Sequence, residues 1–202
     1  MQFERMQTER GNPPVGPVEA WFGQSFIRLH PMLQSLHRRG GSLHGQVHVS
    51  FGVGLAGWLG RRLARKIGVP SRTGDYRFQV EITHSDGTLH WARCFDEGHR
   101  MVSVFVPTGA YPTGSWTEKT GNIALVLGVD ADDGGWTWVQ RAVSLRGVHL
   151  PSWFAPRTTA YKRIVDGRYE FSVKLRLPFL GELFAYGGML SGKSVDCEGD
   201  QG

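Results

Sequence analysis

The feature of this sequence that most constrains its fold is an alternation of apolar and polar residues with a period of two, which recurs between residues 75 and 190. The string YRFQVEITH (76–84) is a clear instance, and the pairs Asp86-Gly87, Asp133-Gly134 and Asp166-Gly167 are typical of tight turns between antiparallel strands. About eight strands follow one another as a meander. The pattern favours an antiparallel barrel or strongly curved sheet over βαβ units, and such a barrel encloses side chains or one small ligand.

Before residue 75 the apolar residues also follow a helical period. The strings PVEAWFGQSFIRL (17–29) and HPMLQSLHRR (30–39) predict N-terminal helices, with Pro31 breaking the run between them. The segment 55–67 predicts an amphipathic helix that covers the barrel as a lid. Weak contact with a membrane surface is the alternative, because four basic residues accompany its apolar stripe. The residues of that stripe are Leu55, Trp58, Leu59, Leu63 and Ile67.

The expected fold class is therefore mainly β (α+β), with these helices covering a barrel or strongly curved sheet of about eight strands. We expect a single domain over residues 17–190, a disordered N-terminal segment over 1–16 and a flexible acidic tail over 191–202. The N-terminus lacks the apolar region of a signal peptide, and the two cysteines form no redox or zinc pattern, so we expect a cytoplasmic protein.

The chain carries a formal net charge of +5. Such an excess tolerates weak attraction to anionic lipid or nucleic acid. No zinc-finger spacing, RNP-like string or recognition-helix pattern is present, so no specific nucleic-acid partner is expected.

Four histidines fall between residues 29 and 52. His44 and His48 share one face of a predicted strand about 13 Å apart, and His30 and His37 lie about two helical turns, roughly 10 Å, apart. Neither spacing brings two ligands to one ion, so no metal site is predicted. We interpret His44 and His48 as solvent-facing and His30 as the cap of the helix that Pro31 begins.

The best candidate site residues are polar side chains on apolar strand faces. Arg93 shares a face with Trp91 and Phe95, so it must be paired, stacked or turned toward a cavity. Facing the barrel interior, Arg93 could hold a carboxylate; on an outer face, it would stack on Trp91. Glu118 is the proposed partner of Arg93, in either a structural pair or a pair that opens onto a pocket. Tyr186, beside two glycines, is a core tyrosine or a hydrogen-bond donor to a ligand.

Six blocks of the chain, taken together, resemble the family known as domain of unknown function 4166 (DUF4166). The blocks are LHPMLQSLH (29–37), GQVHVSFGVG (45–54), WARCF (91–95), WTEKTG (116–121), LRGVHLPSWFAPR (145–157) and DGRYEFSVKLRLPFLGELFAYGGML (166–190). The resemblance implies a bacterial protein of unassigned activity, from a family sometimes fused to oxidoreductase-like domains that bind dinucleotides. We assign no dinucleotide fingerprint and no cofactor to this chain. His37 matches the last position of the family's HP…H block, which makes it a further candidate.

Three functions remain open from the sequence. The first is the binding of a small apolar or amphipathic molecule, possibly anionic, with Arg93, Glu118, Tyr186, His37 and Trp91 as candidate ligand contacts. The second is an enzyme that acts on such a molecule through the same residues. The third, implied by the family's fusions alone, is an accessory domain that holds substrate for a separate oxidoreductase.

Overall fold

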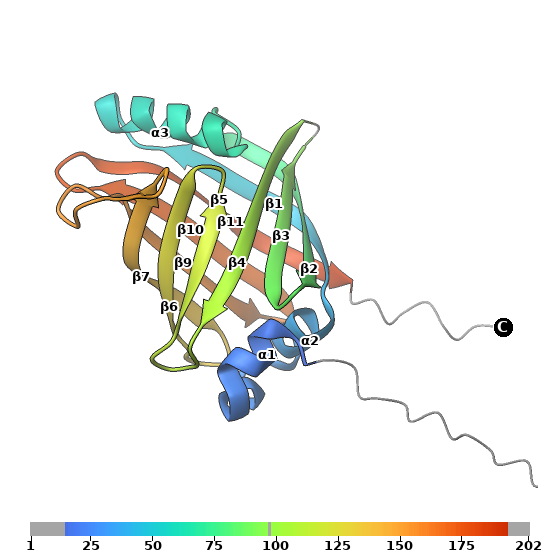
Figure 1. The fold of residues 1–202 in the computed structure, drawn as a ribbon. Helices are drawn as coiled ribbons and strands as arrows, with labels where there is room; N and C mark the ends of the chain where they lie inside the picture. Colours follow the sequence, from blue (N-terminus) through green and yellow to red (C-terminus); the bar gives the residue numbers. More distant parts are fainter. Residues whose placement is uncertain (1–14, 97, 194–202) are drawn as a thin grey trace, which may run out of the picture.

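The structure, a computed structural model, describes residues 15–96 and 98–193 of the 202-residue chain. Its centre is a closed antiparallel barrel of ten strands (Figure 1). The prediction of a mainly β fold with a barrel and N-terminal helices is confirmed, with two more strands than expected. The described chain has eleven strands, of which all but β8 form the barrel: β1 (Gly41–Phe51), β2 (Gly74–Ser85), β3 (Thr88–Phe95), β4 (His99–Thr108), β5 (Ser115–Thr120), β6 (Ile123–Asp130), β7 (Trp136–Leu145), β8 (Val148–His149), β9 (Arg157–Val165), β10 (Arg168–Leu177) and β11 (Gly181–Lys193).

The barrel closes because β6 pairs with both β5 and β7. The order around the ring is β6-β5-β4-β3-β2-β1-β11-β10-β9-β7, and the two-residue β8 pairs only with the end of β7. Residues 115–130 contain no Asp-Gly pair, and in the sequence they have the pattern of one long strand. In the structure this run turns back at Gly121, whose φ of 57° belongs to the left-handed region that glycine adopts most easily, and it forms two strands.

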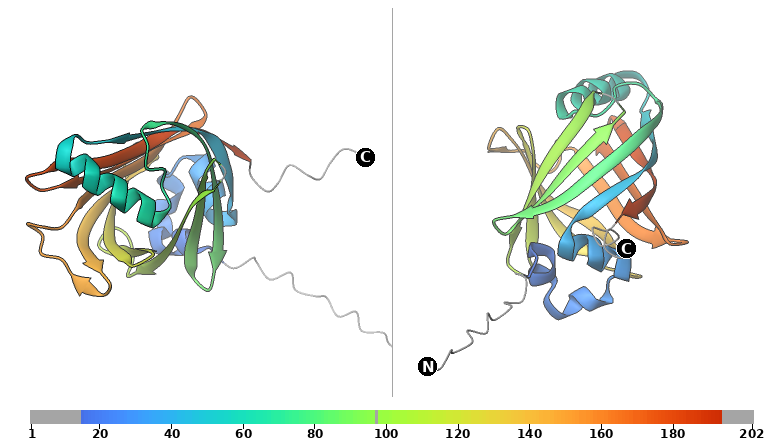
Figure 2. Two further views of the ribbon diagram at one scale, coloured as in Figure 1. Left: turned by 90° about the horizontal axis from the view of Figure 1, so that it is seen from above. Right: turned by 90° about the vertical axis from the view of Figure 1, so that its right-hand side faces the viewer.

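Each end of the barrel is covered by a different set of helices (Figures 1 and 2). At one end lie α1 (Pro17–Phe22), the 3-10 helix η1 (Gly23–Arg28) and α2 (Pro31–Arg39). At the other end α3 (Gly54–Ile67) joins β1 to β2 and lies partly across the strand ends (Figure 2). We refer to these two ends as the α2 end and the α3 end.

The N-terminal helices form part of the core at the α2 end. The indole of Trp21 lies edge-on to the rings of Trp116 and Tyr111, with centroids 5.6 and 5.8 Å away. Phe22 packs on Trp136 at 5.4 Å, and Phe26 is buried beside them. The α2 end is therefore closed by aromatic packing.

The contact face of α3 matches the predicted stripe only in part, since Leu59, Leu63 and Ile67 pack half-buried against the core. Its buried residues are Ala56, Gly57, Gly60 and Ala64, whereas Leu55 and Trp58 are more than half exposed. The reason is the close approach of the helix to β11, since a Cβ added at Gly60 would lie 2.0 Å from the carbonyl oxygen of Leu183. At this closest approach only glycine fits, so larger side chains cannot lie directly between the helix and β11, and Leu55 and Trp58 are exposed.

Within residues 15–96 and 98–193, no helix is both long enough and apolar enough to cross a membrane. Of the predicted terminal segments, residues 1–14 and 194–202 lie outside the part of the chain that the structure describes. The strand β11 extends to Lys193, three residues into the predicted tail.

Candidate functional site

Alternate residues of β3 point into the barrel. Leu89, Trp91, Arg93 and Phe95 are buried, while the residues between them are half-buried on the outer face. Arg93 therefore faces the interior and not an outer face, and it also stacks on Trp91, with its Cζ 5.0 Å from the indole centroid. Four polar or charged side chains are buried among the described residues. They are His37 from α2, Arg93 from β3, Ser103 from β4 and Lys162 from β9.

Arg93 is held by a short polar network inside the barrel. Its Nη1 donates a hydrogen bond to Ser103 Oγ at 2.8 Å, and Ser103 Oγ lies 2.6 Å from Thr120 Oγ1. The carboxylate of Glu118 lies 3.8 Å from Nη2, too long for a direct hydrogen bond. Glu118 thus balances the charge of Arg93 while most hydrogen-bonding positions of the guanidinium stay available.

Lys162 lies among indole rings. Its Nζ is 3.6 Å from the ring centroid of Trp136, 4.4 Å from that of Trp91 and 5.7 Å from that of Trp138. Burial and then the positive charge of Arg93 hold the pKa of Lys162 well below its usual value. Within the described residues no carboxylate lies at ion-pair distance from this amine, so the indole faces offset part of its desolvation without a counter-charge.

His37, on helix α2, contacts Lys162 from the α2 end of the barrel. Its Nε2 lies 2.9 Å from Lys162 Nζ, and its ring stacks between Trp136 (4.9 Å) and Trp91 (6.1 Å). Burial, followed by the charges of Lys162 and His84, lowers the pKa of His37 well below its usual value. The ring is therefore neutral at physiological pH.

Several hydrogen-bonding atoms of these side chains have no partner. Among protein atoms of the described segments, Nε1 of Trp91, Nε1 of Trp136 and Nδ1 of His37 make no hydrogen bond. Indole Nε1 is only ever a donor. With Arg93 and Lys162, these atoms form an interior cluster that is rich in donors and poor in acceptors. We call Arg93, Lys162, His37, Trp91 and Trp136 the donor cluster.

Two tyrosines complete the buried wall near Arg93. Burial raises the pKa values of Tyr169 and Tyr186, so both phenols stay protonated. Tyr186 is 5% exposed and its ring packs on Phe95 and Phe171, with centroids 5.6 and 5.9 Å away. These contacts fit the prediction of a core tyrosine, which faces the same interior as the donor cluster.

The interior is tightly packed at the α2 end and accessible toward the α3 end. Inward residues near α2, such as Leu43, Leu89 and Leu190, are at most 1% exposed. Five strands that neighbour one another in the ring, β5, β6, β7, β9 and β10, carry half-buried inward residues closer to α3. These residues are Glu118, Thr120, Ile123, Leu125, Trp138, Gln140, Thr158, Val173, Leu175 and Leu177. Solvent therefore reaches the inner wall along this arc, which we call the accessible arc.

A separate hollow lies on the outside of the barrel. It has a volume of about 290 Å³ and lies over β1, β11 and β10, where Gly187 leaves the outer surface without a side chain. Its acidic residue, Glu170, is already engaged by Tyr161 (2.9 Å) and Arg163 (2.8 Å). The donor cluster lies on the other side of the sheet, so the two sites are distinct.

All five residues singled out in the sequence face the barrel interior. Trp91 contacts both Arg93 and Lys162 and stacks on His37, Glu118 pairs with Arg93, and Tyr186 lies farther along the wall. Whether they bind a ligand stays a prediction.

Lys162 was not among the residues predicted from the sequence. The string AYKRIV (160–165) has a basic residue on each face of its strand, Lys162 and Arg163, so alternation alone does not show which one is buried. The small Ala160 and the apolar Ile164 on the face of Lys162 are the available signal.

The other histidines lie apart from this cluster. His30 caps α2, its Nδ1 accepting a hydrogen bond from the Met32 amide at 3.2 Å, and His44 and His48 are exposed on the outer face of β1. In the part of the chain that the structure describes, no group of three or more His, Cys, Asp or Glu side chains is arranged to hold a metal ion.

The string GVGLAG (52–57), to which no role was assigned from the sequence, has the G-x-G-x-x-G spacing of dinucleotide-binding turns. That motif acts between parallel strands, but β1 and β2 on either side of α3 are antiparallel neighbours. A Cβ at Gly52 would lie 1.8 Å from the carbonyl oxygen of Glu182, and one at Gly57 would lie 1.9 Å from that of Gly52. Here these glycines allow close packing of α3 against the barrel.

Comparison with protein-family models gives a match to the model described as domain of unknown function (DUF4166), over residues 29–190. The matched range includes the whole barrel except the last residues of β11, and it includes α2 but not α1. None of the curated proteins matches the chain. The resemblance found in the sequence blocks is thereby confirmed.

Proposed function

This chain belongs to the DUF4166 family, and we propose that it binds a small amphipathic molecule with an anionic group, such as a carboxylate, inside its barrel. The anionic group would be held by the donor cluster. The apolar part would extend along the accessible arc toward the α3 end.

The observation that carries this proposal is the imbalance of hydrogen-bonding groups in the donor cluster. Arg93, Lys162 and the Nε1 atoms of two indoles are donors, and the nearest carboxylate, Glu118, stands off from Arg93 at 3.8 Å. Buried donors without acceptors are costly, commonly about 1–3 kcal/mol each. An anion with two or more oxygen atoms would satisfy several of them together and would restore the favourable charge state of Lys162.

The side chains of the accessible arc are suited to the apolar part of the proposed ligand. Leu125, Val173, Leu175 and Leu177 are half-buried, face inward and pack against the core. Small-molecule sites in proteins are typically apolar, with a few polar groups that fix the orientation of the ligand. The proposed pose therefore places the anionic group deep, toward the α2 end, and the tail toward the α3 end.

A matched pair of probes tests the proposal. The full chain is titrated with 11-(dansylamino)undecanoic acid and with its methyl ester, and dansyl emission excited by energy transfer from the tryptophans of the chain is recorded. The variants are Arg93→Ala and Lys162→Met. Lys174→Met, which removes an exposed lysine from the outer face of β10, is the control.

We expect the acid to bind the wild-type chain and the control more tightly than the ester. Each interior variant should weaken acid binding at least tenfold, since truncating one member of a buried charged contact typically costs 2–5 kcal/mol. Equal affinity for acid and ester, or unchanged affinity in both interior variants, would exclude the donor cluster as the anion site. Thermal melts of each variant establish that a lost signal is not lost folding.

A second candidate function follows from the contact between Lys162 and His37. Burial lowers the pKa of Lys162, which favours the unprotonated amine, and such an amine within hydrogen-bond reach of an imidazole is a nucleophile toward aldehydes. The Nζ lone pair would add to the carbonyl carbon, and the resulting carbinolamine would lose water to give an imine. Incubation with dodecanal and borohydride should then add one reduced alkyl group at Lys162, found by peptide mass. Labelling confined to exposed lysines would exclude this reaction.

A further inference from the structure

We propose that the α3 end of the barrel docks on the surface of a membrane that contains anionic lipids. This inference rests on side chains of the outer rim and uses no member of the donor cluster. It therefore goes beyond the proposed function and can fail independently of it.

The first support is the distribution of exposed apolar side chains. Thirteen large apolar residues are exposed in the described chain, and nine of them lie at the α3 end. They come from the start of α3, the β7–β8 turn, the loop before β9 and the β10–β11 turn. These nine are Val53, Leu55, Trp58, Leu145, Val148, Trp153, Phe154, Phe179 and Leu180. Because turns far apart in sequence contribute to one end, the exposed apolar surface belongs to the rim as a whole.

The chemistry of the most exposed residues fits a lipid interface. Phe179 is 97% exposed, Trp153 is 68% exposed and Trp58 is 53% exposed. Trp153 packs edge-on against the neighbouring Phe154, with centroids 5.9 Å apart, so the loop presents two aromatic rings together. Tryptophan and phenylalanine are the side chains that favour the boundary between headgroups and acyl chains.

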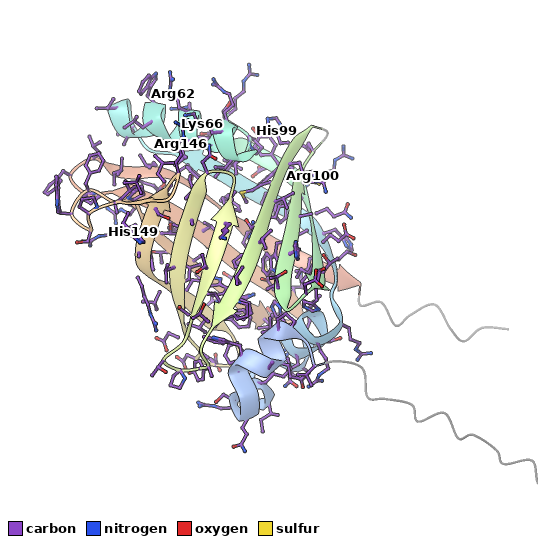
Figure 3. All side chains as sticks on the ribbon, viewed as in Figure 1. Arg62, Lys66, His99, Arg100, Arg146 and His149 are labelled. Carbon is purple, nitrogen blue, oxygen red and sulfur yellow. The ribbon has the colours of Figure 1, made fainter. Side chains whose placement is uncertain are left out.

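The second support is the charge of the same end. Arg62 and Lys66 from α3, Arg100 from β4 and Arg146 from the β7–β8 turn are exposed around the rim, and His99 and His149 lie near them (Figure 3). Arg62 also lies over the ring of Trp58, with its Cζ 5.0 Å from the centroid. Basic side chains interleaved with aromatic ones are the pattern that anionic bilayers attract.

Acidic residues do not cancel this charge. Apart from Glu118 inside the barrel, the acidic side chains at the α3 end among the described residues are Asp75, Asp96 and Glu182. Asp75 pairs with His48 at 2.7 Å, and Asp96 lies 3.4 Å from Arg77. The rim therefore keeps a positive excess.

The turns at the opposite end have the reverse character. The β2–β3 turn carries Asp86, the β6–β7 turn carries Asp132 and Asp133, and the β9–β10 turn carries Asp166. The barrel is thus basic and apolar at one end and acidic in three hairpin turns at the other. An anionic surface would orient the molecule with the α3 end toward it.

Vesicle flotation of the full chain tests the proposal. The vesicles contain phosphatidylcholine alone, or phosphatidylcholine with phosphatidylglycerol. One variant combines Trp153→Ala with Phe179→Ala, and a second combines Arg62→Ser with Arg146→Ser. The matched control combines Ile27→Ala with Val102→Ala, which removes two exposed apolar side chains away from the α3 end.

We expect the wild-type chain and the control to float with the anionic vesicles. Their partitioning into these vesicles should be at least tenfold stronger than into vesicles of phosphatidylcholine alone. The aromatic variant should lose at least tenfold in partitioning. The arginine variant should lose roughly fivefold for each charge removed, and added salt should have a similar effect.

Three results would overturn the proposal. They are no flotation of the wild-type chain, equal binding to both kinds of vesicle, and equal losses in the control and the α3-end variants. If the chain does not float but associates with itself or with an oxidoreductase, the rim is a surface for a protein partner. Binding of the dansyl acid, measured without vesicles, reports on the interior site separately.

Discussion

At the scale of single residues, Lys162 lies in the least favourable environment in the barrel. Taking an ammonium group out of water is expensive, and neither the indole faces nor His37 supplies a counter-charge. A side chain with this cost is retained where it has a use, because marginally stable proteins tolerate destabilised sites that function requires. The proposed anion contact is such a use.

The substitution Lys162→Met should therefore stabilise the ligand-free protein. Burial lowers the pKa of Lys162 in the folded state, so between that value and the ordinary lysine pKa near 10.4 the unfolded chain binds more protons. The free energy of unfolding of the wild type consequently rises with pH in this window. At neutral pH the methionine variant should be more stable by about 1–3 kcal/mol, and the difference should shrink toward pH of about 10.

Urea unfolding of both proteins from neutral to alkaline pH measures this difference. The variant also leaves His37 Nε2 without its partner, which offsets about 1 kcal/mol of the gain. Lys174→Met, on the outer face, should leave the pH dependence unchanged. A wild-type protein that is more stable than the variant at neutral pH would show that Lys162 strengthens the fold itself.

The sequence indicated part of the site because alternation identifies the buried face of a strand with apolar neighbours on both sides. Arg93, between Trp91 and Phe95, was found in this way. Lys162 was not, since β9 has a basic residue on each face. The contact between His37 and Lys162 joins residues 125 positions apart, and no pattern within one segment contains that information.

At the scale of elements, α3 shows how close packing determines which side chains are exposed. Its glycine and alanine face lies directly against β11 and the end of β1, so Leu55 and Trp58 are placed at the rim. The hydrophobic period predicted the helix correctly, and Leu59, Leu63 and Ile67 of the predicted stripe do pack against the core, but Leu55 and Trp58 lie outside the contact face. Hydrophobicity alone favours Leu55 and Trp58 at a contact, whereas the distance between helix and strand requires glycine there.

The substitution Gly60→Ala tests this packing. Alanine is intrinsically the better helix residue, yet its Cβ would lie 2.0 Å from a backbone oxygen of β11, so the helix must move. We expect a loss of about 1–3 kcal/mol, typical of overpacked sites, and a melting temperature lower by several degrees. Arg65→Ala, at an exposed position of the same helix, should change stability by less than about 0.5 kcal/mol. A melting temperature equal to that of wild type would mean that α3 packs more loosely.

Strand pairing was more predictable than strand number. Antiparallel neighbours follow from the turn signals, but closure depends on pairings that link distant segments, such as β1 with β11. These pairings are set by the complete ring and not by any one hairpin, so a closed barrel and a curved open sheet have similar sequences.

At the scale of the whole molecule, the barrel has two unlike ends along one axis. The α2 end is closed by helices and aromatic packing, and it contributes His37 to the donor cluster. The α3 end has a basic and apolar rim, and the accessible arc of the inner wall leads toward it. If both proposals hold, a membrane-docked barrel would present its accessible end to lipid. An amphiphile could then enter with its anionic group leading.

Because of this arrangement, a ligand in the donor cluster should stabilise elements from distant parts of the chain. The donor cluster draws on α2, β3, β7 and β9, which are far apart in sequence. An anion held there links them, and a ligand that binds only the folded state stabilises it by about 2.7 kcal/mol at a concentration of 100 times Kd. We therefore expect the dansyl acid to slow amide hydrogen exchange in all four elements together. For amides that exchange only through global unfolding, the slowing should reach about 100-fold.

Hydrogen exchange followed by mass spectrometry measures this pattern, with the methyl ester as the matched ligand. The ester should protect these elements much less, because it lacks the anion that bridges them. In the Lys162→Met variant the acid should slow amide exchange in the four elements much less than in the wild type. Exchange in α3 should be the same in both proteins. Protection limited to α3 and the turns at its end would instead mean that the amphiphile adsorbs on the rim, and the interior site would be rejected.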